Sequence, residues 1–245
     1  MLLFYNFGRY LLFLASMFSK PEKIGIYISR TFNEMVSIGI NSLPIVAIIA
    51  LFSGGVSTIQ TSYQLIASWI SKTIIGSIVS DTVILEFAPT ITCLVLAGKI
   101  GSSIASEIGT MKVSEQIDAL EVMGINSTGY LALPKIIAGV IMIPMLIIIA
   151  MFLGIWGGMM AGVATAILTA ELFMEGARGS FKTFNVMFAL IKATSFGFII
   201  TSISCFQGYF TEGGALEVGK SSTNAVVYSS VMILCADYVI AQLFL

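Results

Sequence analysis

The side chains of this chain that could do chemistry are few, and many of them gather in one segment. Residues 107–126, EIGTMKVSEQIDALEVMGIN, hold five charged side chains, although only 10% of the 245 residues are charged. The chain has no histidine, which removes the commonest general base and the usual catalytic metal ligand. Its three cysteines stand far apart in apolar runs and predict small core residues, not a disulfide or metal site: Cys93, Cys205 and Cys235.

The acid-rich segment has the pattern of a short amphipathic helix over residues 113–124. Its three acids recur at every third position and share a face: Glu115, Asp118 and Glu121. Its apolar residues form a separate stripe: Ile117, Leu120 and Met123. We expect Ser114 to cap a helix that begins at Glu115, and Gly124 to end it.

A helix of about ten residues is marginally stable alone, so another surface should hold this one. Three acids disfavour an anionic membrane leaflet, which leaves a protein partner as the favoured surface. The plainer alternative is a solvated loop helix between two membrane spans.

The rest of the chain is strongly apolar, with 57% hydrophobic residues and a mean hydropathy of +0.99. A membrane-spanning helix needs about 20 mostly apolar residues. Five stretches meet this need: 36–54, 83–105, 134–165, 184–208 and 223–245. The sequence therefore predicts one all-α integral membrane domain over residues 1–245. Its net charge of −1 offers no basic surface for nucleic acid.

Positive charge predicts the orientation of these spans. Eight cations fall in or beside the N-terminal region and the connections after the second and fourth spans: Arg9, Lys20, Lys23, Arg30, Lys99, Lys112, Lys135 and Lys220. Three fall in the other two connections: Lys72, Arg178 and Lys182. This places the N-terminus and the acid-rich helix in the cytoplasm, and the C-terminus on the periplasmic side.

The first residues need a separate interpretation. Residues 1–18 lack the basic start and the small-residue cleavage site of a signal peptide. A sixth span would be short, with Arg9 in its middle. We favour a helix within the region 1–30 that lies in the membrane interface, with aromatic side chains at headgroup level.

Several charges fall inside or at the edge of the spans: Glu86, Lys99, Glu107, Lys192 and Asp237. Lys192 and Asp237 have opposite signs and equal predicted depth on consecutive antiparallel helices, so we expect them to pair. The pair would fix the register of the two helices. Glu86 is expected at the outer end of the second span, where it would contact a lipid headgroup or a periplasmic partner, or simply face water.

At 97–126, AGKIGSSIASEIGTMKVSEQIDALEVMGIN resembles the signature of the MlaE-type permeases, the membrane subunits of bacterial ABC transporters for phospholipid or related lipids. The likeness continues in four short motifs: GIWGG at 154–158, LIKA at 190–193, GY at 208–209 and ADYV at 236–239. Three residues depart from the usual family pattern. Lys99 stands where the family usually has Arg, Leu85 removes a cation beside Glu86, and Ser127 replaces a common Pro.

The resemblance implies a role for the acid-rich helix. It would be the coupling helix that docks on a cytoplasmic ATPase. We expect Glu115, Asp118 and Glu121 to face the ATPase surface or its rim, and Ile117 and Leu120 to contact the ATPase or seat the helix. This chain has no G-x-x-x-x-G-K-[ST] motif, so no cofactor is expected on it, and a separate ATPase subunit would bind ATP and Mg²⁺. The family further implies a homodimer in the bacterial inner membrane, a periplasmic ring of lipid-binding MCE-domain proteins, and a role in outer-membrane lipid homeostasis.

Two other classes of function stay open. The charges within the spans are compatible with a secondary transporter of an apolar substrate, driven by an ion gradient, although no inverted repeat is visible. A membrane enzyme acting on lipid is the third class, but neither a nucleophile–base pair nor a metal motif supports it.

Overall fold

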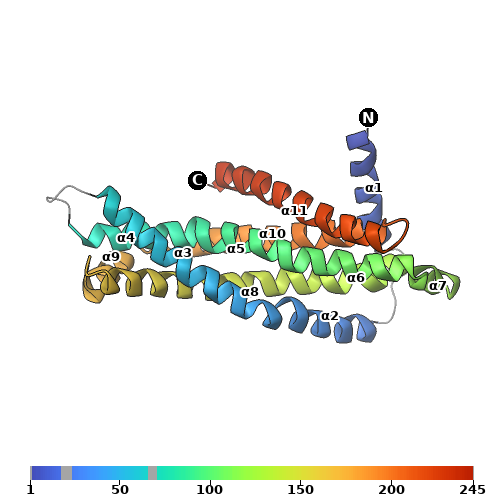
Figure 1. The fold of residues 1–245 in the computed structure, drawn as a ribbon, viewed down its shortest axis with the longest axis horizontal. Coiled ribbons are helices and arrows are strands. Elements are labelled where there is room, and N and C mark those ends of the chain that lie inside the picture. The colour runs from blue at the N-terminus through green and yellow to red at the C-terminus, as the bar shows by residue number, and fades with distance from the viewer. Residues whose placement is uncertain (1, 18–23, 66–70, 245) are drawn as a thin grey trace. The chain divides into compact units, whose positions relative to one another are not determined.

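Helices joined by short connections make up the described part of the chain, which is residues 2–17, 24–65 and 71–244 of a computed structural model (Figure 1). The α-helices are α1 (Leu2–Ser16), α2 (Ile24–Ile38), α3 (Leu43–Gln64), α4 (Thr73–Thr82), α5 (Thr92–Leu96), α6 (Ser102–Val113), α7 (Gln116–Val122), α8 (Ser127–Ala164), α9 (Ala170–Gly179), α10 (Thr183–Tyr209) and α11 (Ala215–Phe244). A 3-10 turn, η1 (Ile40–Ser42), and two π-helices, η2 (Val83–Ile91) and η3 (Ala97–Gly101), join consecutive helices.

The described residues contain five helices long and apolar enough to cross a membrane, which confirms the predicted fold class. They are Gly25–Gln64, Thr73–Val113, Ser127–Ala164, Thr183–Tyr209 and Ala215–Phe244. All are longer than the apolar stretches in the sequence, because polar residues extend the helices at their ends. The 15-residue α1 is too short to belong to this set: at about 1.5 Å per residue it does not match the roughly 30 Å hydrocarbon core.

The chain divides into two compact units, which we describe separately. The first unit comprises residues 1–41, 94–142 and 195–238. The second unit comprises residues 42–93, 143–194 and 239–245.

One predicted boundary was wrong, and one segment was not predicted as a helix. The helix expected in residues 1–18 corresponds to α1, and its place in the membrane interface stays a prediction. A further helix, α2, begins at Ile24 and runs through η1 into α3. Pro44, in the first turn of α3, lacks a backbone N–H and so favours the start of a new helical segment there. The second long helix begins at Thr73, not near residue 83, because the more polar stretch 73–82 is also helical and packs on α9.

In the second unit, glycines bring helices into close contact. A Cβ atom on Gly54 of α3 would overlap the carbonyl oxygen of Gly154 of α8. A Cβ on Gly158 would lie 2.8 Å from the Thr58 hydroxyl oxygen. Gly154 and Gly158 thus form a smooth contact with α3, as small residues do in membrane helices.

The helix α9 is held against α4 by an apolar cluster and by two further glycine contacts (Figure 1). Phe173 of α9 is fully buried among Ile75, Val79 and Val83. The α9 N-terminus is capped by Thr169, whose hydroxyl accepts a hydrogen bond from the Leu172 amide.

In the first unit, α1 packs on the C-terminal end of α10 through aromatic rings. Phe13 is buried, and its ring lies 5.8 Å from Phe206 and 5.4 Å from Tyr209, centroid to centroid. The Tyr10 hydroxyl lies 2.7 Å from the Ser202 hydroxyl, a hydrogen bond in which either group donates. α1 also leaves Leu11 and Leu12 exposed.

Candidate functional site

The short helix α7 lies between the second and third long helices, as the acid-rich segment predicted, but it begins later than expected. Ser114 does not cap it: the Ser114 hydroxyl donates to the Thr110 carbonyl oxygen, 2.7 Å away. Glu115 instead adopts the left-handed conformation, with φ of 59°, and turns the chain between α6 and α7. Gly124 has φ of 78° after the helix, which fits its predicted role as the stop.

The apolar stripe of α7 divides into a buried part and an exposed part. Ile117 is fully buried and Leu120 is half-buried. Val122 is 89% exposed and Met123 is 66% exposed, so the end of α7 presents apolar side chains that its own unit does not cover. Ile117 thus seats α7 on its own unit, while Val122 and Met123 leave an apolar tip uncovered; we call these two residues the α7 tip.

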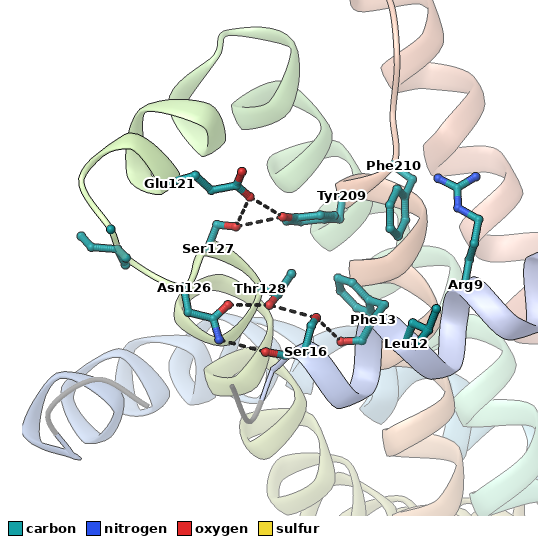
Figure 2. Close-up of a pocket in the computed structure, with 12 residues that line it drawn as sticks. Arg9, Leu12, Phe13, Ser16, Glu121, Asn126, Ser127, Thr128, Tyr209 and Phe210 are labelled. Atoms are coloured by element: carbon teal, nitrogen blue, oxygen red, sulfur yellow. Dashed lines mark hydrogen bonds between the residues drawn. The ribbon is translucent and has the colours of Figure 1, made fainter. Parts of the chain in front are cut away.

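Polar contacts fasten α7 to the rest of the first unit (Figure 2). Glu121 Oε1 lies 2.8 Å from both the Ser127 hydroxyl and the Tyr209 hydroxyl, and each can donate to it. These two hydroxyl oxygens also lie 2.8 Å apart. The carboxylate therefore ties α7 to the start of α8 and the end of α10. Lys112 Nζ forms an ion pair of 2.6 Å with Asp118, on a more exposed side of α7.

A cavity of about 630 Å³ lies beside this network. Glu121 and Tyr209 line it from α7 and α10, and Arg9 and Phe13 line it from α1. Ser16, at the end of α1, accepts a hydrogen bond of 2.9 Å from Asn126 to its carbonyl oxygen. Figure 2 shows these side chains converging from three separate segments of the sequence.

A second polar cluster in the first unit surrounds Lys135 of α8. The side chain is 3% exposed, and its Nζ lies 2.6 Å from Glu34 and 2.8 Å from Glu107. Glu107, expected at the membrane edge, thus joins α6 to α8, and Lys135 holds α6 and α2 together through the two carboxylates. Lys99, the other residue expected there, donates to the Asn41 carbonyl oxygen.

In the second unit, Lys192 of α10 is fully buried and bonds to the π-helix η2. Its Nζ lies 2.9 Å from Glu86 Oε1 and 3.2 Å from the Leu85 carbonyl oxygen, and 4.8 Å from the centre of the Phe188 ring. Glu86 is therefore not at the outer end of its helix, because the helix begins 13 residues earlier at Thr73. π-Helical turns are frequent at functional sites.

The predicted pairing of Lys192 with Asp237 stays a prediction. Lys192 belongs to the second unit and Asp237 to the first, so each is described in its own surroundings. A role of Glu86 in contacting a lipid headgroup or a periplasmic partner also stays a prediction.

A comparison with protein families decides which family this chain belongs to. The family described as Permease MlaE matches residues 31–243, most of the chain. This chain is a member of the MlaE permease family. The resemblance seen in the sequence at 97–126 is thereby confirmed.

Relatives of this permease occur in bacteria and in plants. A probable ABC transporter permease protein of Rickettsia bellii is 36% identical over 98% of this chain and 92% of its own length. The intermembrane phospholipid transport system permease protein MlaE of Haemophilus influenzae is 29% identical, over 94% of this chain and 87% of its own. The chloroplastic protein TRIGALACTOSYLDIACYLGLYCEROL 1 of Arabidopsis thaliana is 34% identical, over 89% of this chain and 62% of its own.

The structure of the permease adds contacts that sequence reasoning missed. Tyr209 and Ser127 were noted only as a motif residue and as a departure from the family, yet both bond to Glu121. Lys135 was counted as a surface cation and is instead buried between two carboxylates. Lys135 stands directly before a long apolar run, and a cation so placed needs a partner, which is the signal that could have suggested its ion pairs.

Proposed function

We propose that this permease is the membrane subunit of an ATP-driven transporter that moves phospholipid or a related lipid between the inner membrane and a periplasmic lipid-binding partner with an MCE domain. Two copies of the chain would form the lipid path. ATP and Mg²⁺ would bind to a separate cytoplasmic ATPase. The printed names of the relatives, an ABC transporter permease and an intermembrane phospholipid transport permease, support this proposal.

The observation that carries the proposal is the α7 tip. Val122 and Met123 expose apolar side chains on a short helix whose other side is fastened by Ile117 and Glu121. An exposed apolar tip surrounded by charge matches the centre of a protein interface, where apolar anchors contribute most and rim charges contribute less. Glu115, Asp118 and Leu120 would surround this contact.

Transport would use the apolar surfaces of the long helices without covalent chemistry on the lipid. Among the described residues, no group of three or more cysteine or acidic side chains is placed to hold a metal ion. The ion pairs of the buried Lys135 and Lys192 side chains would hold helices in register while the lipid path opens.

The test is reconstitution of the purified permease with the ATPase that co-purifies from native membranes. Transfer of a fluorescent phospholipid out of the vesicles should require ATP and should stop when the ATPase cannot hydrolyse it. Transfer that continues without ATP, and that collapses when an ion gradient is dissipated, would instead establish the secondary transporter.

A further inference from the structure

A second cavity in the first unit has the features of a binding site for a membrane lipid. It measures about 410 Å³ and is bounded by α1, α10 and α11. Arg9 and Phe210 line it, and both also line the larger cavity beside α7. These two residues therefore stand at the junction of the two cavities.

Arg9 is placed to bind an anion. Its guanidinium carbon lies 4.2 Å from the centre of the Phe210 ring and 5.7 Å from that of Tyr5 (Figure 2 shows the Phe210 contact). Within the described residues, Arg9 makes these ring contacts and no ion pair or hydrogen bond. The half-buried guanidinium of Arg9 therefore keeps its N–H donors available for a ligand. These donors lie in one plane, which suits hydrogen bonds to the oxygens of a phosphate.

The polarity of the cavity changes along its length. α10 and α11 run in opposite directions on either side of their short connection, and each contributes one polar and one apolar residue in the same order. On α10, Gln207 lies nearer the connection than Ile203 does. On α11, Asn224 lies nearer the connection than Met232, which follows eight residues later, about 12 Å along the helix.

This gradient matches an amphiphile with a phosphate at one end and a hydrocarbon chain at the other. The exposed side of α1 supports such a ligand, because the Leu11 and Leu12 side chains on that side need an apolar environment. We propose that this cavity binds a membrane phospholipid, with its phosphate on Arg9 and its acyl chain along Ile203 and Met232. We name it the Arg9 site.

The lipid at the Arg9 site would be a resident one that anchors α1 to the membrane. With the orientation that the positive charges predict, it would come from the cytoplasmic leaflet. The site is independent of the proposed transport activity, since it needs neither ATP nor a second copy of the chain.

The experiment measures lipid binding to the full-length permease by native mass spectrometry, with dioleoylphosphatidylglycerol as the probe. Dioleoylglycerol serves as the same lipid without phosphate, and inorganic phosphate serves as a competitor without acyl chains. Arg9→Gln removes the cation, and Lys220→Gln removes a cation that lies outside the cavity and pairs with Glu217. Met232→Trp fills the apolar end while Arg9 is intact.

We expect Arg9→Gln to weaken phosphatidylglycerol binding on the order of tenfold, since charge-assisted hydrogen bonds are lost. Lys220→Gln should bind as the unchanged chain does. Dioleoylglycerol should bind the unchanged chain as weakly as phosphatidylglycerol binds Arg9→Gln. Met232→Trp should weaken both lipids, and inorganic phosphate should displace little of the bound phosphatidylglycerol.

Equal binding of phosphatidylglycerol by Arg9→Gln and Lys220→Gln would overturn the proposal. So would full displacement by inorganic phosphate together with no effect of Met232→Trp, which would indicate a site for free phosphate. If Arg9→Gln does not yield folded protein, two other variants test the proposal. Arg9→Lys must bind phosphatidylglycerol more weakly, because lysine lacks the planar guanidinium. Met232→Trp must also bind it more weakly.

Discussion

The helices α7 and α9 both connect long helices, but their own units hold them by different means. α9 buries Phe173 fully and meets α4 at Gly76 and Gly176, where backbone approaches backbone. α7 buries Ile117 and is otherwise fastened by side-chain hydrogen bonds and an ion pair. α9 therefore satisfies its apolar surface within its unit, whereas α7 leaves an apolar tip for a partner.

The difference suggests what each helix is suited to do. Close packing of backbones tolerates no added volume, so α9 is a fixed part of its unit. Polar contacts that share one carboxylate can rearrange at low cost, which suits a helix that must follow the movements of a partner. The predictions below test this difference, from the largest expected effect to the smallest.

The largest effect should come from Gly176→Val in α9. A Cβ atom at Gly176 would overlap the Thr73 carbonyl oxygen, and backbone cannot move aside as a side chain can. We expect a cost of at least about 3 kcal/mol and little folded protein. Fluorescence-detected size-exclusion chromatography measures the folded yield. Gly179→Val is the matched control, since a Cβ there has no atom within 4 Å, and it should fold normally.

The next effect concerns the α7 tip. Val122→Asp should leave folding intact because the side chain is 89% exposed, and it should weaken association with the ATPase by about 1–3 kcal/mol if Val122 is an interface anchor. Quantitative co-purification measures the association, and Val122→Leu, which keeps the tip apolar, should bind normally. Leu120→Asp should also uncouple the complex, but Leu120 is half-buried and part of its effect would be on folding. Normal ATPase association by Val122→Asp would remove the α7 tip from the interface.

The fastening of α7 ranks third. Glu121→Ala removes the acceptor shared by Ser127 and Tyr209 and should destabilise α7 locally by about 1–2 kcal/mol, since hydrogen bonds to a charged group are lost. Hydrogen exchange at residues 116–123 should speed up accordingly. Glu115→Ala is the control, because Glu115 lies on the same segment and is exposed, without a side-chain hydrogen bond among the described residues. Equal exchange in both variants would show that α7 is not held by Glu121.

Much of the fold could be predicted from the sequence, because the signals are local. Apolar stretches of sufficient length identify the five long helices, and the acids of residues 113–124 identify α7. Helix ends were predicted less well. The stretch 73–82 mixes Ser77, Ser80 and Asp81 with four apolar residues, so it did not read as part of a continuous apolar span, yet it is helical and packs on α9.

The contacts of the candidate site could be predicted only in part, because they join residues far apart in the chain. Glu121 was assigned to a partner surface, since nothing in its neighbourhood indicates that Tyr209, 88 residues away, donates to it. Glu86 was placed at a helix end because the sequence put the start of its helix near residue 83, whereas the helix begins at Thr73. Lys192 was expected to need a partner because a buried cation is costly, and the structure shows Glu86 among its partners.

The smallest effect should come from the ion pair between Lys112 and Asp118. It is short, at 2.6 Å, but the two side chains are 30% and 52% exposed, so water and salt screen the attraction. Lys112→Ala should destabilise α7 by no more than about 0.5 kcal/mol, and the difference from the unchanged chain should shrink as salt is raised. Hydrogen exchange at residues 116–123, measured at low and high salt, tests both statements. If Lys112→Ala speeds exchange as much as Glu121→Ala does, the polar contacts of α7 act as one unit. The prediction that the Glu121 carboxylate stabilises α7 more than the ion pair does would then be wrong.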